Sequence, residues 1–311
     1  MLGKTSKSSK FYLTKIYIAN FNSKLKSSVT FLWEFFMQNE NKLSSAEKWE
    51  KLTFADNYIF CKVMETNPDV CKEMLELLLN IKIERIEIPK TEYTIKTDYD
   101  SRGIRLDVYV KDETGRCFDI EIQTSVEKEL ALAKRTRYYQ GLMDVDSVFT
   151  GIKYKDLNET YVIFLCLGDA FDFGLPVYTF ENVCTENPKV KMNDGTHKIF
   201  FNAQKYDTMK SEELKSFFKY LCGKEPSSDF SEKLSAIVKR IKMNARWRHE
   251  FMTWQDEIEF QAKKASEERA VETAQKMLDS NLGTPEQIAS VTSLPLEKIL
   301  ELQKEAKLVK A

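Results

Sequence analysis

The chain has little histidine, no closely spaced cysteine pair and no long apolar run. Its 311 residues include two histidines, and its six cysteines are scattered: Cys61, Cys71, Cys117, Cys166, Cys184 and Cys222. Zinc sites draw on His and Cys at close spacing, so a zinc protein is not expected. Cys166 lies inside an apolar run, as a buried free thiol would, and free thiols suit a cytoplasmic protein.

No stretch approaches the roughly 18–20 apolar residues of a membrane span, so no membrane partner is expected. The net charge is −1. A nucleic acid would therefore have to meet a local basic surface rather than a basic molecule. With 42% hydrophobic residues, the chain is long enough for one domain of about 150–200 residues with extensions.

Residues 103–123, GIRLDVYVKDETGRCFDIEIQ, contain two runs with an apolar residue at every second position. The apolar positions are Ile104, Leu106, Val108 and Val110, then Phe118, Ile120 and Ile122. This period predicts two strands. Glu113, Thr114 and Gly115 fit a three-residue hairpin loop with Gly115 in the left-handed conformation.

The loop predicts the register of the hairpin. If Asp112 pairs with Arg116, then Asp107 lies directly opposite Glu121. Cross-strand neighbours have Cβ atoms roughly 4.5–5.5 Å apart, and like charges placed there destabilise a sheet. A divalent cation such as Mg²⁺ or Mn²⁺, held by both carboxylates, would compensate. The alternative is a solvent-facing hairpin whose two acids point apart into water.

One motif resembles the core of the PD-(D/E)XK nucleases: Leu106-Asp107, then thirteen residues, then Glu121-Ile122-Gln123. More narrowly, it resembles the recombination-promoting nuclease branch, whose members are also called PD-(D/E)XK nuclease family transposases. The resemblance runs roughly from Leu52 to Trp254 and includes the segments KRTRYYQGLM, TYVIFLC, GLPVYTFEN, DGTHKIFFN and WRHEFM. Two positions depart from the superfamily pattern. Leu106 replaces the proline, and Gln123 stands where the catalytic lysine usually stands, although glutamine is typical of this branch.

The resemblance implies an α/β fold with a mixed sheet: a restriction-endonuclease-like α-β-β-β-α-β core, added strands and a helical C-terminal extension. The first strand is expected at 92–97, the hairpin supplies the next two, and YVIFLCL at 161–167 suits a buried central strand. Paired strands at 174–182 and 191–202 follow, with a turn at Asn193-Asp194-Gly195. His197, beside that turn, is interpreted as structural.

The resemblance also implies a site. Asp107 and Glu121 would bind Mg²⁺ or Mn²⁺ with the main-chain carbonyl of Ile122, and Gln123 would orient water or a phosphate oxygen. In this superfamily a helix before the sheet often carries a further acid. Asp56 is the candidate, in a helix that Thr53 would cap, and the alternative is a first-turn acid favoured by the helix dipole.

A helix expected at 127–145 carries Lys134, Arg135 and Arg137 within one turn. It follows the strand that ends in Glu-x-Gln, so these cations could meet nucleic acid phosphates. The alternative is a solvated face balancing nearby acids. The match to an Arg…Tyr-Tyr pattern of the family favours a functional Arg135, which could supply the charge of the missing lysine.

Four segments are expected. Residues 1–45 form a basic, flexible N-terminal extension, and 46–225 form the nuclease-like domain. Residues 226–280 form a long helical segment, and 281–311 form a small tail that resembles a helix-turn-helix. Residues 1–36 are either a DNA-binding arm or an upstream extension before a natural start at Met37, which we favour. Acidic residues in the tail's second helix argue against base reading, and the C-terminal helices are candidates for homodimer formation.

The leading hypothesis is a metal-dependent DNA endonuclease that promotes recombination or movement of DNA. One rival is an inactive nuclease fold that acts in nucleic acid binding or regulation. The Gln123 replacement supports this rival, and the intact Asp107 and Glu121 argue against it. A third interpretation keeps the chemistry but makes RNA the substrate. The sequence alone does not separate DNA from RNA.

Overall fold

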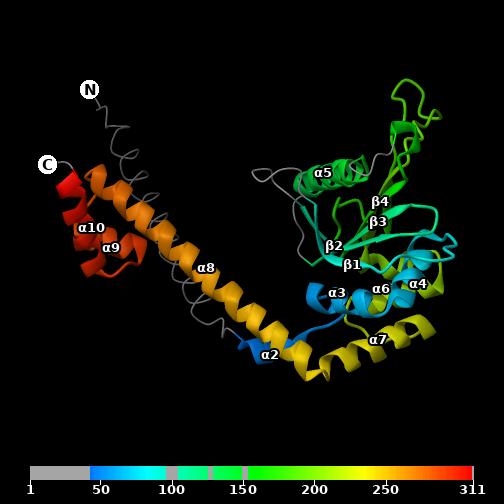
Figure 1. Cartoon of the computed structure of the whole chain (residues 1–311), viewed down its shortest axis with the longest axis horizontal. Coiled ribbons are helices and arrows are strands. Elements are labelled where there is room, and N and C mark those ends of the chain that lie inside the picture. The colour runs from blue at the N-terminus through cyan, green and yellow to red at the C-terminus, as the bar shows by residue number, and fades with distance from the viewer. Residues whose placement is uncertain (1–42, 96–103, 125–128, 149–152, 310–311) are drawn as a thin grey trace, which may run out of the picture. The chain divides into compact units, whose positions relative to one another are not determined.

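The structure is a computed structural model that describes residues 43–95, 104–124, 129–148 and 153–309 (Figure 1). The predictions for residues 1–42, including the basic arm and the start at Met37, lie outside these residues. The helices are α2 (Ser45–Lys51), α3 (Asn57–Thr66), α4 (Pro68–Leu79), α5 (Glu129–Val148), α6 (Glu212–Leu221), α7 (Asp229–Lys242), α8 (Ala245–Asp279), α9 (Pro285–Thr292) and α10 (Leu296–Val309), with 3₁₀ turns at Tyr154–Asp156 and Ala203–Thr208.

Six strands form one mixed sheet in the order β1-β2-β3-β4-β6-β5. The strands are β1 (Lys90–Ile95), β2 (Ile104–Lys111), β3 (Cys117–Gln123), β4 (Thr160–Cys166), β5 (Val177–Phe180) and β6 (Thr196–Asn202). Strands β3, β4 and β6 run parallel, and the other neighbours are antiparallel. This arrangement confirms the expected α-β-β-β-α-β order with added strands and a helical C-terminal region.

Helices cover both faces of the sheet (Figure 1). On one face α5 closes a core that contains Leu106, Val162 and Phe164. On the other, α3, α4, α6 and α7 enclose a larger core that includes Val108, Ile120 and Ile163. Successive side chains of β4 pack alternately in the two cores. The sequence of β4 is continuously apolar because both of its faces are buried.

The hairpin turn matches the sequence prediction. Gly115 has φ 87°, and the backbone N–H of Asp112 donates to the carbonyl of Arg116 at 3.1 Å. The buried Asp112 carboxylate accepts from the N–H and Oγ1 of Thr114 at 3.0 and 2.8 Å, and from the N–H and Nε of Arg116 at 2.9 and 2.5 Å. These bonds fix the loop and therefore the pairing of β2 with β3.

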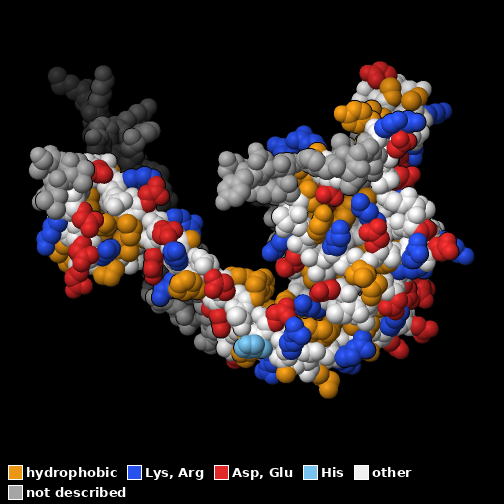
Figure 2. Space-filling model, viewed as in Figure 1, with side chains coloured by type: hydrophobic (Ala, Val, Ile, Leu, Met, Phe, Trp, Pro, Cys, Tyr) orange, Lys and Arg blue, Asp and Glu red, His pale blue; other side chains and the backbone are white. Residues whose placement is uncertain are grey.

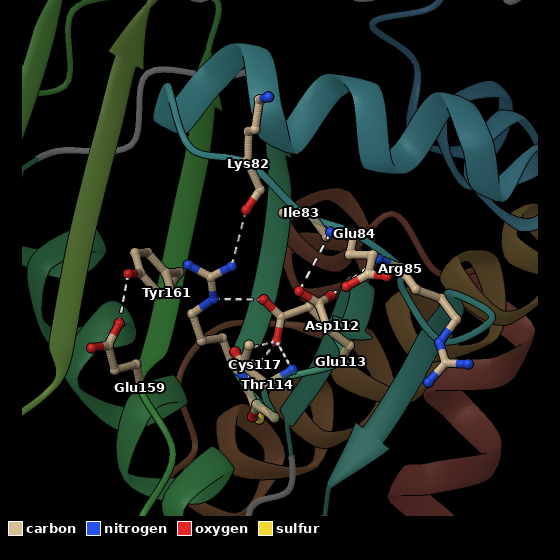
Figure 3. Close-up of polar contacts among 12 residues, drawn as sticks. Lys82, Ile83, Glu84, Arg85, Asp112, Glu113, Thr114, Cys117, Glu159 and Tyr161 are labelled. Carbon is tan, nitrogen blue, oxygen red and sulfur yellow. Dashed lines mark hydrogen bonds and ion pairs between the residues drawn. The ribbon is translucent and has the colours of Figure 1, made fainter.

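The segment that follows α4 forms hydrogen bonds with this turn (Figure 3). The Glu113 carboxylate accepts the backbone N–H groups of Glu84 and Arg85 at 3.4 and 3.1 Å. The Arg116 guanidinium donates to the carbonyl of Lys82 at 3.5 Å. These bonds anchor the turn end of the hairpin.

The apolar residues of β2 do not share one face, contrary to the simple alternation of the sequence. Leu106 packs under α5, whereas Val108 packs in the opposite core, so the strand changes faces at Asp107. Glu92, the position between the pairs Thr91–Val108 and Tyr93–Leu106 in β1, has φ 50°. A left-handed residue in β1 lets both strands change faces together.

The strands β5 and β6 pair as expected, but the turn does not lie at Asn193-Asp194-Gly195. The chain reverses nearer Asn187, whose carbonyl accepts the N–H of Val190 at 2.9 Å. The Asp194 carboxylate instead accepts the N–H of Thr196 at 3.2 Å and leads the chain into β6. His197 stacks on Tyr161, with ring centroids 4.2 Å apart, which is a packing role.

The long C-terminal helical segment divides into α7 and α8 at Met243 and Asn244. Phe230 and Leu234 of α7 and Phe251 of α8 belong to the larger core. The far end of α8 packs with α9 and α10 around a small separate cluster: Ala274, Ile288, Ile299 and Leu302. None of the helices in the described part of the chain is long and apolar enough to cross a membrane.

Candidate active site

The two acids that the hairpin register places opposite each other meet where β2 and β3 separate. The last paired residues are Val108 and Ile120, and Asp107 and Glu121 come next. The Glu121 carboxylate accepts the backbone N–H of Asp107 at 2.9 Å. The Asp107 carboxylate accepts the backbone N–H of Ile122 at 3.2 Å. Each carboxylate therefore replaces a backbone carbonyl of the strand ladder.

Burial and mutual repulsion raise the pKa of both acids. Glu121 is 5% exposed, and desolvation together with the charge of Asp107 raises its pKa to about 7. Desolvation also raises the pKa of Asp107, although the N–H of Ile122 and the amide of Asn57 oppose the shift. Two desolvated carboxylates at one point form a site of excess negative charge, which a cation would relieve.

A third carboxylate, Asp119, lies deeper on β3 and was not singled out in the sequence. It is fully buried, and no N–H or hydroxyl group in the described residues lies within hydrogen-bonding distance of its oxygens. Desolvation and the neighbouring charge of Glu121 raise its pKa well above the usual range. Burial therefore favours the neutral, protonated form of Asp119 over its carboxylate.

The α3 residue that contacts Asp107 is Cys61, whereas Asp56 binds Thr53. Asp56 is the N-cap residue of α3, and its carboxylate accepts from the N–H and Oγ1 of Thr53 at 2.6 and 2.9 Å. Thr53 therefore does not cap the helix. The Asn57 side chain lowers the pKa of the Asp107 carboxyl. The Cys61 thiol, one turn along, donates to the Asp107 carbonyl at 3.4 Å and to Asn57 Oδ1 at 3.6 Å.

Gln123 and Arg135 meet on the α5 side of the sheet. An Arg135 terminal nitrogen donates to Gln123 Oε1 at 2.7 Å. The guanidinium also lies over the Phe164 ring, 5.1 Å from its centroid, and its charge lowers the pKa of Asp107 and of Glu121. Lys134 and Arg137 are exposed on the same helix. Of the three cations in this turn, Arg135 is the one that contacts the acidic site through Gln123.

The residues fit a divalent ion that keeps several waters. Among the described residues, no three His, Cys, Asp or Glu side chains are grouped so that they could hold a metal ion. Asp107 and Glu121 supply two carboxylates, and Mg²⁺ commonly binds through one or two carboxylates plus water. In a strand, a residue's N–H and C=O point to the same side, so the carbonyl of Ile122 faces β2, as its N–H does.

The face of the molecule in Figure 2 carries charges of both signs. Lys and Arg side chains are interspersed with Asp and Glu on the face that Figure 2 shows, as the net charge of −1 would suggest. A polyanionic substrate would therefore be held by a few local cations close to the site, and long-range attraction would contribute little.

A comparison with protein families gives one match, which agrees with this geometry. The family model described as PD-(D/E)XK nuclease family transposase matches residues 54–228. That interval begins just before α3, contains all six strands and ends at the N-cap of α7. Searches of curated proteins and of solved structures return no match.

Proposed function

Since the chain belongs to the family of PD-(D/E)XK nuclease family transposases, we propose that it is a Mg²⁺-dependent DNA endonuclease that promotes recombination or movement of DNA. The observation that carries the proposal is the meeting of Asp107 and Glu121 at the open end of the hairpin, with Arg135 and Gln123 beside them. Nucleases of this superfamily generally use divalent metals.

Asp107, Glu121 and the carbonyl of Ile122 would hold the ion, which supplies a water of lowered pKa and neutralises charge on the phosphate. The N–H of Ile122 orients the Asp107 carboxylate, and the N–H of Asp107 orients that of Glu121. Gln123 cannot carry charge, so its amide orients a water or a phosphate oxygen. Arg135 holds that amide and places a permanent positive charge beside the phosphate.

Lys134 and Arg137 are exposed on α5 and would contact the phosphates that flank the cleaved bond. Contacts of this kind position a nucleic acid without reading its sequence. Affinity should therefore fall with salt, and each lost phosphate contact should make the salt dependence shallower.

Cleavage of supercoiled plasmid by the full chain in Mg²⁺ or Mn²⁺ tests the function. Asp107→Asn and Glu121→Gln are the informative variants because an amide oxygen still accepts the cross-strand N–H. Nicking or linearisation that requires metal and is lost in both variants would support the proposal. If the wild-type protein leaves plasmid intact, or if all three proteins cut equally, Asp107 and Glu121 are not a DNA nuclease site. A parallel assay on single-stranded RNA shows whether RNA is cut instead.

A further inference from the structure

A pocket of about 140 Å³ lies beside the candidate site, between α3, β1 and the start of α8. Asn57 and Cys61 line it. The Cys61 thiol donates to the main-chain carbonyl of Asp107 at 3.4 Å, and the Asn57 side chain lowers the pKa of Asp107, so the pocket lies next to Asp107. A phosphate held at Asp107 would therefore have one of its own flanking nucleotides within reach of the pocket.

Aromatic rings form part of the pocket wall. Tyr58 comes from α3 and Trp254 from α8, and their ring centroids are 6.4 Å apart. Phe251 supports Trp254 from the core side, at 6.1 Å between centroids. Trp254 is still 37% exposed, so part of the indole remains accessible to a ligand. Aromatic side chains of this kind stack on nucleobases whatever their sequence.

The charges on the pocket exclude a phosphate. Glu65, Glu92 and Glu250 line it against one cation, Lys62. The Lys62 ammonium already binds Glu250 at 3.0 Å and Glu65 at 3.4 Å. A further anion would meet excess negative charge, whereas the exocyclic amino group of a base is a donor that a carboxylate accepts.

We propose that this pocket binds one unstacked nucleobase next to the phosphate held at Asp107. The inference rests on the proposed nuclease function and gives its substrate class: DNA with an unpaired nucleotide at the cleavage site, such as an overhang, a flap or a mismatch. A fully paired duplex must first expel a base from its stack, which costs free energy. The protein would therefore prefer substrates in which the base is already free.

The preference can be measured with matched oligonucleotides that carry either one unpaired base or full pairing at a single position. We expect the wild-type kcat/KM to be at least tenfold higher for the unpaired substrate. Trp254→Ala should lower that preference about fivefold to a hundredfold, the range expected for loss of one stacked base. Phe173→Ala is the control, since Phe173 is an aromatic residue that is 81% exposed and lies outside the pocket.

Binding gives a readout that does not depend on cleavage. A 2-aminopurine placed at the unpaired position should lose fluorescence when the Glu121→Gln protein binds in Ca²⁺, and much less so in Glu121→Gln/Trp254→Ala. Cleavage without preference, unchanged by Trp254→Ala, would overturn the pocket assignment and leave the nuclease function standing. If quenching depends on Trp254 but the wild type does not cleave DNA, the nuclease function is overturned and the pocket assignment stands.

Discussion

Each of the two opposed carboxylates accepts a backbone N–H from the other strand, so alanine at either position removes an acceptor as well as a charge. A buried N–H left without an acceptor costs about 1–3 kcal/mol. The hairpin turn predicted this opposition correctly, because the loop fixes the register. The sequence could not show that Cys61 contacts Asp107, since that contact depends on how α3 packs against β2.

Arg135 and Arg137, two residues apart on α5, should affect different kinetic constants. Arg135 donates to Gln123 and faces the acids, so Arg135→Gln should lower kcat about 10²–10³-fold, as loss of a positioned charge does. Arg137 is exposed, so Arg137→Gln should instead raise KM and make its salt dependence shallower. Steady-state cleavage at several salt concentrations separates the two. Equal effects on kcat would contradict the assignment of Arg135.

The raised pKa of Glu121 predicts a pH-dependent stability. Its pKa rises from 4.5 to about 7 on folding, so between these values the folded protein binds more protons than the unfolded chain. Stability should therefore fall as pH rises through this window, by at most about 3 kcal/mol. Glu121→Gln removes the contribution of Glu121 and keeps the acceptor, whereas Asp107 and Asp119, whose pKa values are also raised, still contribute in both proteins. Urea unfolding of both proteins at pH 5–8 measures it, and parallel curves would show that Glu121 does not titrate there.

Mg²⁺ should counter the loss of folding stability at high pH. Metal binding requires the ionised carboxylate, so added Mg²⁺ should raise the melting temperature of the wild type more at pH 8 than at pH 6. Glu121→Gln should show a smaller shift at both pH values.

The hairpin β2–β3 is the element that could be read most fully from the sequence, and its turn explains why. Gly115 and the Asp112–Arg116 pairing are local signals that survive in the fold. The distribution of apolar residues over the two faces was not predicted, because the change of faces at Asp107 needs a left-handed Glu92 in a neighbouring strand. Similarly, only packing decides that Arg135 faces the sheet while Lys134 and Arg137 face solvent.

Asp112→Ala should destabilise the protein by about 3 kcal/mol, because it leaves two N–H groups and the Arg116 guanidinium without their buried acceptor. Glu113→Gln, in the same turn but exposed, should cost much less. Urea unfolding followed by circular dichroism compares the two. Similar losses from both variants would mean that the buried carboxylate does not hold the turn.

At the scale of the whole molecule, the central part of α8 leaves two large apolar side chains exposed. Ile258 and Phe260 are 42% and 62% exposed. Acidic Asp256 and Glu257 precede basic Lys263 and Lys264 by about two turns. In an antiparallel pair of α8 helices related by a twofold axis near Phe260, the acidic stretch of one copy would lie beside the basic stretch of the other.

We therefore predict a homodimer through α8. Asp256→Lys/Glu257→Lys should weaken it, and adding Lys263→Glu/Lys264→Glu should restore it, because the reversed charges are again complementary. Light scattering after gel filtration gives the mass of each form. A monomeric wild type, or a dimer that tolerates the first pair of reversals, would exclude this interface.

The backbone N–H groups that the Asp107 and Glu121 carboxylates accept also affect how such a protein would change over generations. A lineage that stopped cutting DNA would still need both oxygens to close its sheet, so selection for folding alone would retain acids or amides at these positions. Arg135 donates to the Gln123 side chain and lies over the Tyr139 and Phe164 rings. Retention of Asp107 and Glu121 in a descendant of this chain would therefore not by itself show that the descendant still cuts DNA.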